Sequence, residues 1–455
     1  MNMSGRIFKG FIAGIVLFCA LSLQAAADGG TYSSYSPYSI FGIGDMILPG
    51  TALNHGMGGV GIALRNKKFI NPLNPAAVTA RDSLAFMADF SVRGENKYFG
   101  QGDIRSVNNV FNVSDGIISF PIWRSSAMMV GIMPLSGTGF GYKSTYTNPE
   151  VIGVTGPVSY AATGTGSVYQ LFAGIGATFW KRLSIGAQFT YLFGNIEKSY
   201  YQTFTQTSLV GANTYYELQL TGFGGKFGLQ YEQPLGSKAS MCLGATYSLS
   251  TPFRGYVEKY KLSTGTGSSD KEFYFIDTLA VAKPRVRTAS EKGVGLALKF
   301  NDRWMIEFDY TRSDWGVSNF DTHDGFAGNL SVMSGKSWFT STVAETYRLG
   351  FEIVPNKNDI RYYMLNCAYR AGVYFKKDYF LLDGSPIYGY GITVGMTFPV
   401  FRWHNGISIA LEFARRGFDF GRNSGVANNL IRESCFNFTV GINVFDIWFQ
   451  KPRYE

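Results

Sequence analysis

A two-residue alternation of apolar and polar side chains runs through most of this chain, and it is the pattern of a β-strand whose two faces meet different surroundings. From Leu183 to Tyr191, for example, every odd position is apolar and every even position is serine, glycine, glutamine or threonine. The alternation predicts an all-β protein of fourteen antiparallel strands. The segments lie near residues 83–93, 104–122, 126–144, 163–180, 183–200, 214–232, 238–260, 284–300, 303–313, 341–354, 360–376, 386–399, 405–415 and 434–448.

The connections between these segments alternate in length. Outer-membrane barrels have short periplasmic turns, long external loops and an even number of strands. A soluble sandwich or propeller has no reason to keep this order. We therefore predict a transmembrane β-barrel over residues 83–455, in contact with lipid of the outer membrane of a Gram-negative bacterium. The short connections are 123–125, 181–182, 233–237, 301–302, 355–359 and 400–404, and the longer ones are 145–162, 201–213, 261–283, 314–339 and 416–433.

Composition excludes other classes of protein. Hydrophobic residues make up 45% of the chain and charged residues 16%, which is too apolar for a disordered chain. No run of about 20 apolar residues follows the first 27 residues, so we expect no membrane-spanning helix. The formal net charge of +9 is spread along the chain without a basic stripe, so we expect no nucleic-acid partner.

Residues 1–27 have the three parts of a secretory signal peptide. Arg6 and Lys9 form a positive start, and an apolar stretch from Phe11 to Leu23 follows that is too short to span a bilayer as a helix. Three alanines, Ala25 to Ala27, supply a small-residue cleavage site. We expect cleavage after Ala27, and an uncleaved anchor helix is the alternative.

Residues 28–82 precede the first strand and lack the alternation. They contain a glycine-rich stretch around Gly58 and Gly59, followed by Asn74, Pro75 and Ala76. Glycine permits tight packing and a positive φ, and an Asn-Pro pair marks a turn. Because fourteen strands enclose an open lumen unless something fills it, we predict that residues 28–82 form an irregular plug, or hatch. A flexible periplasmic tail is the alternative.

The sequence resembles the FadL/TodX family of outer-membrane transporters of hydrophobic compounds at these motifs. In that family a glycine-rich stretch precedes an Asn-Pro-Ala motif in an N-terminal hatch. Two further matches follow in the chain, one from Pro284 through Asp309-Tyr310 to Trp315, and one at Tyr369-Arg370-Ala371-Gly372. The resemblance implies passive uptake of long-chain fatty acids or other hydrophobic compounds, with a lateral exit through the barrel wall beside a kinked strand.

The third segment has the composition of such a kink. Pro134 lacks the N–H that a strand ladder needs, and Gly137, Gly139 and Gly141 permit a bulge. These four residues are the candidates for a lateral opening. A bend of the strand at the outer rim, made for closure of the barrel, is the alternative.

Charged side chains occupy the strand faces opposite the apolar ones, and buried charges persist only when they are paired. They therefore predict a structural network that fixes the plug and the strand register. Alternatively, one arginine or lysine holds the carboxylate of a ligand, for which the two-pronged donor geometry of arginine is suited. The residues are Lys226, Glu232, Arg285, Arg287, Glu307, Asp309, Arg348, Glu352, Arg370 and Glu412.

Catalysis has little support in the sequence. His55, His323 and His404 belong to the plug, a long loop and a short turn, so they do not meet in one site with a nucleophile. No cysteine or histidine spacing is typical of a metal site. We expect no enzyme, no cofactor and no metal.

Two functions remain. The first is transport of a hydrophobic small molecule. The second is a structural or adaptor role for a FadL-like barrel with a secretion-system partner, as in the PorV component of type IX secretion. The barrel-assembly machinery is an expected partner during biogenesis.

Overall fold

The computed structural model describes residues 34–81, 85–123, 125–146, 156–204, 211–265, 268–281, 283–328, 339–357, 359, 361–400, 405–418 and 430–447. The expected leader, residues 1–27, lies outside these ranges. Within them, no helix has both the length and the apolar character needed to cross a membrane.

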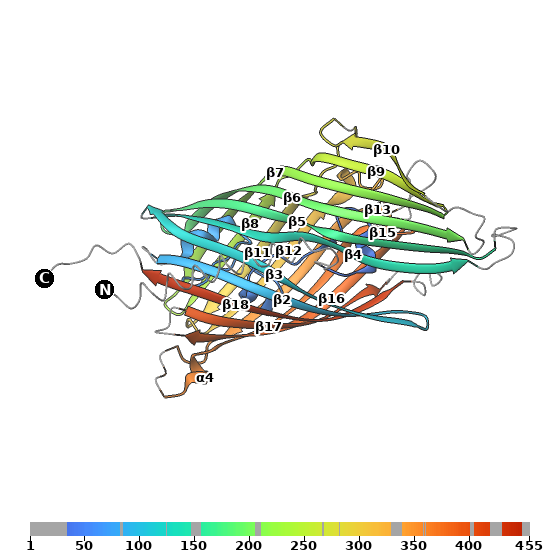
Figure 1. Cartoon of the computed structure of the whole chain (residues 1–455). Coiled ribbons are helices and arrows are strands. Elements are labelled where there is room, and N and C mark those ends of the chain that lie inside the picture. Colours follow the sequence, from blue (N-terminus) through green and yellow to red (C-terminus); the bar gives the residue numbers. More distant parts are fainter. Residues whose placement is uncertain are drawn as a thin grey trace, which may run out of the picture.

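Fourteen strands form a closed antiparallel barrel, as the sequence predicted (Figure 1). The ring closes where β18 pairs with β2 from Arg432↔Gly100 to Ile447↔Ala85. Its strands are β2 (Ala85–Gln101), β3 (Ile104–Trp123), β4 (Ser126–Tyr146), β5 (Val158–Phe179), β6 (Leu183–Phe204), β7 (Gly211–Leu235), β8 (Ala239–Ser248), β11 (Ser290–Phe300), β12 (Trp304–Asp314), β14 (Val343–Ile353), β15 (Ala368–Leu382), β16 (Ser385–Val400), β17 (Asn405–Phe418) and β18 (Arg432–Ile447).

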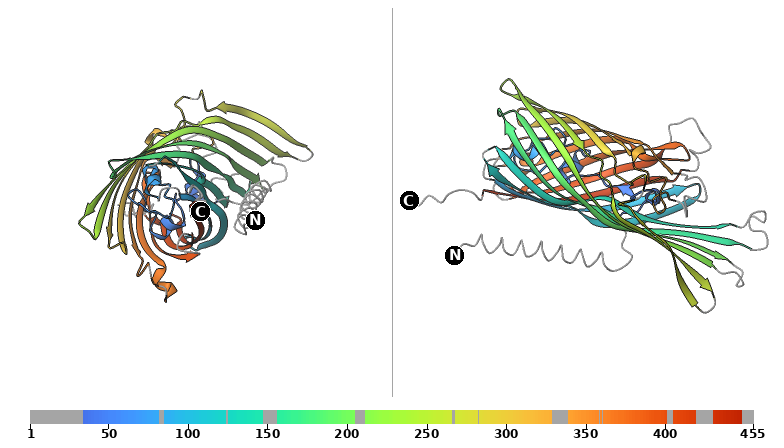
Figure 2. Two further views of the ribbon diagram at one scale, coloured as in Figure 1. Left: turned by 90° about the vertical axis from the view of Figure 1, so that its left-hand side faces the viewer. Right: turned by 90° about the horizontal axis from the view of Figure 1, so that it is seen from above.

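A hairpin of β9 (Arg254–Gly265) and β10 (Ser268–Thr278) projects from the ring (Figure 2). The second half of β7 pairs with β8, whereas its first half pairs with β9. The prediction of one strand over 238–260 followed by a loop is therefore wrong, because the chain leaves the ring between β8 and β9. Two short elements, η4 (Trp315–Val317) and β13 (Phe339–Ser341), lie near the same end of the barrel.

Several predicted strand ends and loop lengths also differ from the structure. β11 begins at Ser290 rather than 284, and β15 begins at Ala368, after a turn that contains α4 (Tyr363–Asn366). At the end that carries the long loops, β2–β3 and β15–β16 are joined by two-residue turns at 102–103 and 383–384. Loop length therefore does not alternate strictly, because long strands can meet in a tight turn outside the membrane.

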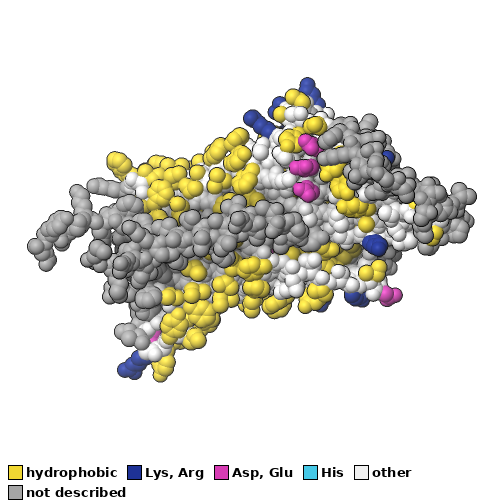
Figure 3. Space-filling view, viewed as in Figure 1, with side chains coloured by type: hydrophobic (Ala, Val, Ile, Leu, Met, Phe, Trp, Pro, Cys, Tyr) yellow, Lys and Arg dark blue, Asp and Glu magenta, His cyan; other side chains and the backbone are white. Residues whose placement is uncertain are grey.

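The alternation along each strand separates a lipid-facing surface from the lumen. On β12, Trp304, Ile306 and Phe308 are 42–45% exposed, whereas Glu307 and Asp309 are fully buried. Hydrophobic side chains accordingly gather in a broad band over the half of the barrel nearer the short turns (Figure 3). Lipid on one side of the wall accounts for this pattern.

Aromatic side chains mark the end of the barrel that carries the short turns. Trp123 and Trp180 are 77% and 84% exposed, and α4, which contains the exposed Tyr363, projects from the same end (Figure 1). Tryptophan and tyrosine concentrate where a membrane meets water. Following the rule for outer-membrane barrels, we call this end periplasmic and the opposite end external.

Residues 34–81, called the N-terminal segment below, lie inside the ring (Figure 2). The segment contains η1 (Pro37–Ile40), β1 (Asp45–Met46), α2 (Ala52–Gly56) and η2 (Pro75–Ala80). Its α2 packs on β16 and β17, and its η2 packs on β5 and β6. The lumen therefore holds a folded segment of the chain itself.

Candidate functional site

The glycine-rich stretch allows the N-terminal segment to approach the barrel wall closely. Gly58 and Gly59 have φ angles of +71° and +80°, which L side chains rarely adopt. A Cβ atom at Gly58 would lie 3.1 Å from the backbone of Val373 on β15. Gly58 also donates its N–H to Thr393 Oγ1 at 2.7 Å. These two glycines thus permit backbone-to-wall contact.

Asn74, Pro75 and Ala76 fix a second part of the segment. The Asn74 side chain accepts the Ala76 N–H at 3.0 Å, which caps η2, and donates to the Ile62 carbonyl at 2.7 Å. The residue of the barrel wall opposite Asn74 is Gly228 of β7, where a Cβ atom would lie 2.0 Å from Asn74 Oδ1. The motif is therefore matched by a wall glycine that sequence reasoning did not single out.

Two of the predicted lumen carboxylates hold the backbone of the N-terminal segment. Asp309 Oδ2 accepts the N–H groups of Gly61 and Ile62 at 2.7 and 3.0 Å. Glu307 Oε1 accepts the N–H of Ala63 at 2.8 Å. Both side chains are buried, and one oxygen of each carboxylate is thus committed to the backbone of the segment.

Arg370 is also held within the protein. Its Nε lies 2.7 Å from Glu352 Oε2, and its Nη1 donates to Thr397 Oγ1. Other lumen charges form further pairs, namely Arg93–Glu412 at 2.6 Å and Arg65–Glu232 at 3.1 Å.

Arg285 and Arg287 do not face the lumen from a strand, so that prediction is wrong. They precede β11, and the carbonyl of Arg285 accepts a hydrogen bond from Asn319 while the N–H of Arg287 donates to Ser318. Arg285 is exposed. The segment packs against the loop after β12 because these hydrogen bonds replace a continuation of the ladder.

A cavity of about 350 Å³ lies between the N-terminal segment and the wall. Lys226 and Arg348 line it, and neither forms an ion pair among the described residues. Arg348 donates to Thr311 at 3.2 Å, but its Nε is buried without a hydrogen-bond partner there. The apolar part of the lining consists of Met46, Ile47, Leu48, Met133, Leu135, Leu192 and Leu249. The cavity therefore combines an apolar surface with charged groups of both signs, since carboxylates such as Glu291 and Asp309 line it together with Lys226 and Arg348.

An apolar cluster fills the lumen on the external side of this cavity. Phe41 of the N-terminal segment stacks on Phe339 with ring centroids 5.4 Å apart and also contacts Phe380 at 5.7 Å. Lys198 of β6 is buried beside this cluster, and its Nζ donates to the carbonyls of Ile40 and Gly325, each at 2.7 Å. The described residues thus form a packed cluster on the external side of the cavity.

The barrel wall is split between β3 and β4. Their pairing runs from Trp123↔Ser126 to Gly116↔Ile132 and ends there, although both strands continue outward. The pairing of β4 with β5 is irregular between Pro134 and Ser136, where Leu135 is extra. Pro134 has no N–H to offer a neighbouring strand, and a bulge re-aims the chain. We call this split the β3–β4 seam.

The N-terminal segment covers the β4 side of the seam. Within β1, Asp45 pairs with Gly137. Ser36 N–H donates to the Gly139 carbonyl at 2.8 Å, and Tyr35 Oη lies 3.5 Å from the Gly141 carbonyl. All four candidates for a lateral opening therefore lie at the seam or beside it, and three of them contact the N-terminal segment.

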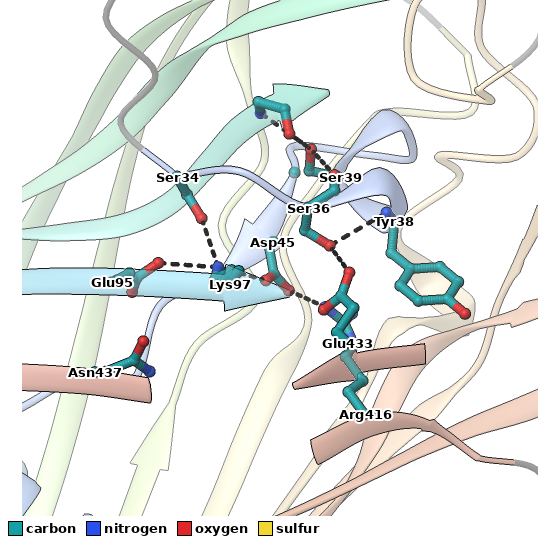
Figure 4. A network of polar contacts seen from close by, with 12 residues as sticks. Ser34, Ser36, Tyr38, Ser39, Asp45, Glu95, Lys97, Arg416, Glu433 and Asn437 are labelled. Atoms are coloured by element: carbon teal, nitrogen blue, oxygen red, sulfur yellow. Dashed lines mark hydrogen bonds and ion pairs between the residues drawn. The ribbon is translucent and has the colours of Figure 1, made fainter. Parts of the chain in front are cut away.

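A buried ion network ties the covering segment to the barrel (Figure 4). Arg416 on β17 lies 2.9 Å from Asp45 and 2.6 Å from Asp378, and it also faces Glu433 at 3.5 Å. Lys97 on β2 lies 4.0 Å from Asp45. Glu433 accepts a hydrogen bond from Ser36 of the segment. Residues of three strands thereby converge on β1 and η1.

The histidines described by the structure lie apart. His55 of α2 is buried beside Arg93, with 3.0 Å between Nδ1 and Nη1. Burial and this guanidinium lower the pKa of His55 to about 3, so its ring is neutral. His323 contacts the Pro284 carbonyl at 2.7 Å near the external end. His404 lies outside the described residues.

A closed ring of fourteen strands around a folded N-terminal segment, with a seam between β3 and β4, defines a β-barrel of the FadL type in the outer membrane of Gram-negative bacteria. The solved toluene transporters TbuX of Ralstonia pickettii and TodX of Pseudomonas putida have this fold. Their TM-scores are 0.57 and 0.56 at 15% and 14% identity. The alignments cover 87% and 90% of this chain and 97% and 100% of theirs.

The monoaromatic hydrocarbon channel CymD is similar, with a TM-score of 0.57, 14% identity, and coverage of 89% of this chain and 99% of its own. The resemblance expected from the sequence is therefore confirmed for the fold. A sequence profile of the BamG family matches residues 7–455, so this chain belongs to the BamG family. No curated protein sequence matches it.

Proposed function

We propose that this protein is an accessory barrel that acts by binding other outer-membrane proteins, as a component of the barrel-assembly machinery. The observation that carries the proposal is the packing of the chain's own N-terminal segment against the inner wall of the ring, which supports closure of the lumen by a plug. The name of the BamG family adds support, because it points to barrel assembly. Of the two partners considered from the sequence, it favours the assembly machinery over a secretion system.

Contacts of the N-terminal segment with the barrel at several levels support this proposal. On the external side, Phe41 and its aromatic neighbours form a packed cluster. At the seam, β1 and η1 occupy the β4 edge and are tied down by Arg416 and Lys97. Deeper in the barrel, Asp309 and Glu307 hold the backbone of residues 61–63. We propose on this basis that residues 28–82 act as a plug, after removal of residues 1–27 as a leader.

Two measurements test this proposal. In planar lipid bilayers, the purified protein is expected to show no steady conductance, because the plug fills the lumen. When a tagged chain is extracted from outer membranes with a polymer that keeps the surrounding lipid, subunits of the barrel-assembly machinery are expected to co-purify in a fixed ratio. Recovery of the chain alone, together with steady conductance, would refute the proposal.

A second candidate function is passive transport of a hydrophobic compound with lateral exit through the β3–β4 seam. The cavity supports it, because its volume lies in the range of about 300–1,000 Å³ that is typical of ligand pockets. Lys226 and Arg348 would hold the carboxylate of a long-chain fatty acid, and the apolar lining would hold its chain. Transport would further require the aromatic cluster and the cover on β4 to move.

Native mass spectrometry of detergent-extracted protein tests this candidate. The double variant Lys226→Met, Arg348→Met is expected to lose bound fatty acids. The matched control, Lys299→Met, removes an exposed cation that pairs with Asp302 and should retain them. Equal amounts of fatty acid in both variants would contradict a role for the two cations, and absence of any bound hydrophobic molecule from the wild type would contradict transport.

A further inference from the structure

The β3 side of the seam is a strand edge that no described strand pairs with. From Ile104 to Phe111, β3 pairs with β2 on one side only. On the opposite side of the seam, β4 has gained β1 as a neighbour. Within the part of the chain that the structure describes, one edge of the split wall is therefore covered and the other has no strand partner over the eight residues 104–111. Such an edge is a template for pairing with another chain.

The geometry of the hairpin shows which residues direct their backbone to this edge. The two-residue turn at 102–103 joins Gln101 and Ile104, which are register partners. In such a hairpin the residues flanking the turn form a hydrogen-bonded pair, and the pairs then alternate. Val107 and Asn109 therefore fall in pairs that are not hydrogen-bonded to β2, so their N–H and C=O groups face the seam. Asn108 lies between them, and its backbone N–H and C=O groups face β2 instead.

The exposed outward face of this edge alternates between apolar and polar side chains, with Val107 and Phe111 interspersed with Arg105 and Asn109. Val107 and Phe111 are 55% and 58% exposed, and Tyr98, the register partner of Val107 on β2, is 54% exposed. Ile104 at the tip is 73% exposed. Toward the lumen, Asn108 Oδ1 is buried without a hydrogen-bond partner among the described residues. An apolar strip of Tyr98, Val107 and Phe111, interrupted by Asn109, thus runs beside the backbone edge.

The position of the strip along the barrel argues for a protein partner rather than lipid. A tilted strand crosses the hydrocarbon layer in about 10 residues. Counted outward from Trp123 at the periplasmic rim, that distance ends at about residue 113. Residues 104–111 therefore lie at or beyond the external membrane surface, where lipid tails do not cover them. Exposed apolar side chains in that position are typical of a binding surface.

We infer that the β3 edge binds an extended strand of a partner outer-membrane protein by β-augmentation. The partner strand continues the ladder of β3 through its backbone and packs alternate apolar side chains against Tyr98, Val107 and Phe111. The inference rests on the proposed function as an accessory barrel, and it names the surface and the kind of segment that the barrel holds. A strand suits this edge because strands are the common element of its proposed partners.

A pair of variants at one position isolates the backbone contribution. Asn109→Pro and Asn109→Ala both remove the side chain, but the proline variant also removes the N–H that faces the seam and leaves the β2–β3 bonds intact. With a photoreactive phenylalanine at position 107, irradiation of intact outer membranes is expected to crosslink a partner barrel at one extended segment, which peptide mass spectrometry maps. The crosslink should fall about fivefold or more in Asn109→Pro and remain in Asn109→Ala.

The shift of both variants on unheated gels checks that they fold. The control for chance contact is a photoreactive residue in place of Glu197, which is exposed on β6, a strand that is paired on both sides. Crosslinks to lipid alone, crosslinks to a second copy of this chain, or equal yields in the two variants would each overturn the inference. If the assembly machinery co-purifies but position 107 gives no crosslink, the proposed function stands and this inference fails. If the machinery does not co-purify and position 107 still crosslinks a strand of another barrel, this inference stands and the proposed role in the assembly machinery fails.

Discussion

Replacement of Asp45 by alanine is expected to loosen the N-terminal segment from β4 while the barrel stays folded. Asp45 lies on β1, and its nearest cation, Arg416, lies on β17 at 2.9 Å. After the replacement, Arg416 keeps Asp378 at 2.6 Å, and Lys97 keeps Glu95 at 2.9 Å. No cation is left buried and unpaired. The loss is therefore that of one hydrogen bond between charged groups, about 1.5–3 kcal/mol.

A loss of about 2 kcal/mol raises the population of the released segment about 30-fold, since every 1.4 kcal/mol is tenfold. Amide hydrogen exchange measures this population. The N–H groups of Ser36 and Ile47 donate to carbonyls of β4 at 2.8 and 3.0 Å, so both should exchange about 30-fold faster in Asp45→Ala. Amides of β12 and β14, on another part of the ring, should not change.

The matched control is Asp302→Ala. Asp302 also pairs with a lysine at 2.9 Å, but its side chain is 75% exposed, and such pairs contribute about 0–1 kcal/mol. This variant should leave the exchange of Ser36 and Ile47 unchanged. If Asp45→Ala changes these two amides by less than about threefold, the ion network does not hold the segment. If it accelerates the whole barrel equally, Asp45 supports the barrel rather than the cover.

Three further predictions concern other parts of the molecule. In Gly228→Val the new side chain would overlap the Asn74 side chain. The barrel should still shift on unheated gels, but trypsin should cut the displaced N-terminal segment. The control is Leu229→Val, at the next residue, which faces outward. Burial raises the pKa of Asp45, but three nearby cations outweigh it and hold the pKa below 3.8. The stabilisation is thus lost only as pH falls below that value, and protection of Ile47 at pH 5 should equal that at pH 7. Tyr363→Asp removes an interfacial ring and its 2.9 Å hydrogen bond to the Pro399 carbonyl at the end of β16, and should lower the unfolding free energy in lipid by about 1 kcal/mol.

The sequence predicted the ring because lipid imposes a strict rule on one face of every strand. That rule predicted the number of strands in the ring and placed β6 and β12 within a few residues. It does not act outside the membrane, and for that reason the β9–β10 hairpin was missed. The true start of β11 was missed too, which placed Arg285 and Arg287 wrongly in the lumen.

The ion network at the seam was missed for a related reason. Lys97, Asp378, Arg416 and Glu433 each lie just beyond a predicted strand end, at 93, 376, 415 and 434. Extension of the alternation by one to four residues would have placed them on the lumen side. Asp45 gave no such signal, because β1 is only two residues long and its role depends on a long-range contact. The sequence alone also could not show which charged residues pair with each other.

The weakest junction of the ring is not the one where the two ends of the barrel meet. β18 and β2 are paired along their whole lengths, whereas β3 and β4 pair only from Trp123↔Ser126 to Gly116↔Ile132. Yet β3 and β4 are consecutive strands, joined covalently at the periplasmic rim. Separation of β3 from β4 would begin at the external end, where they are unpaired, and would end at their covalent connection. An opening at this junction would therefore leave β3 and β4 joined to each other and the pairing of β18 with β2 intact.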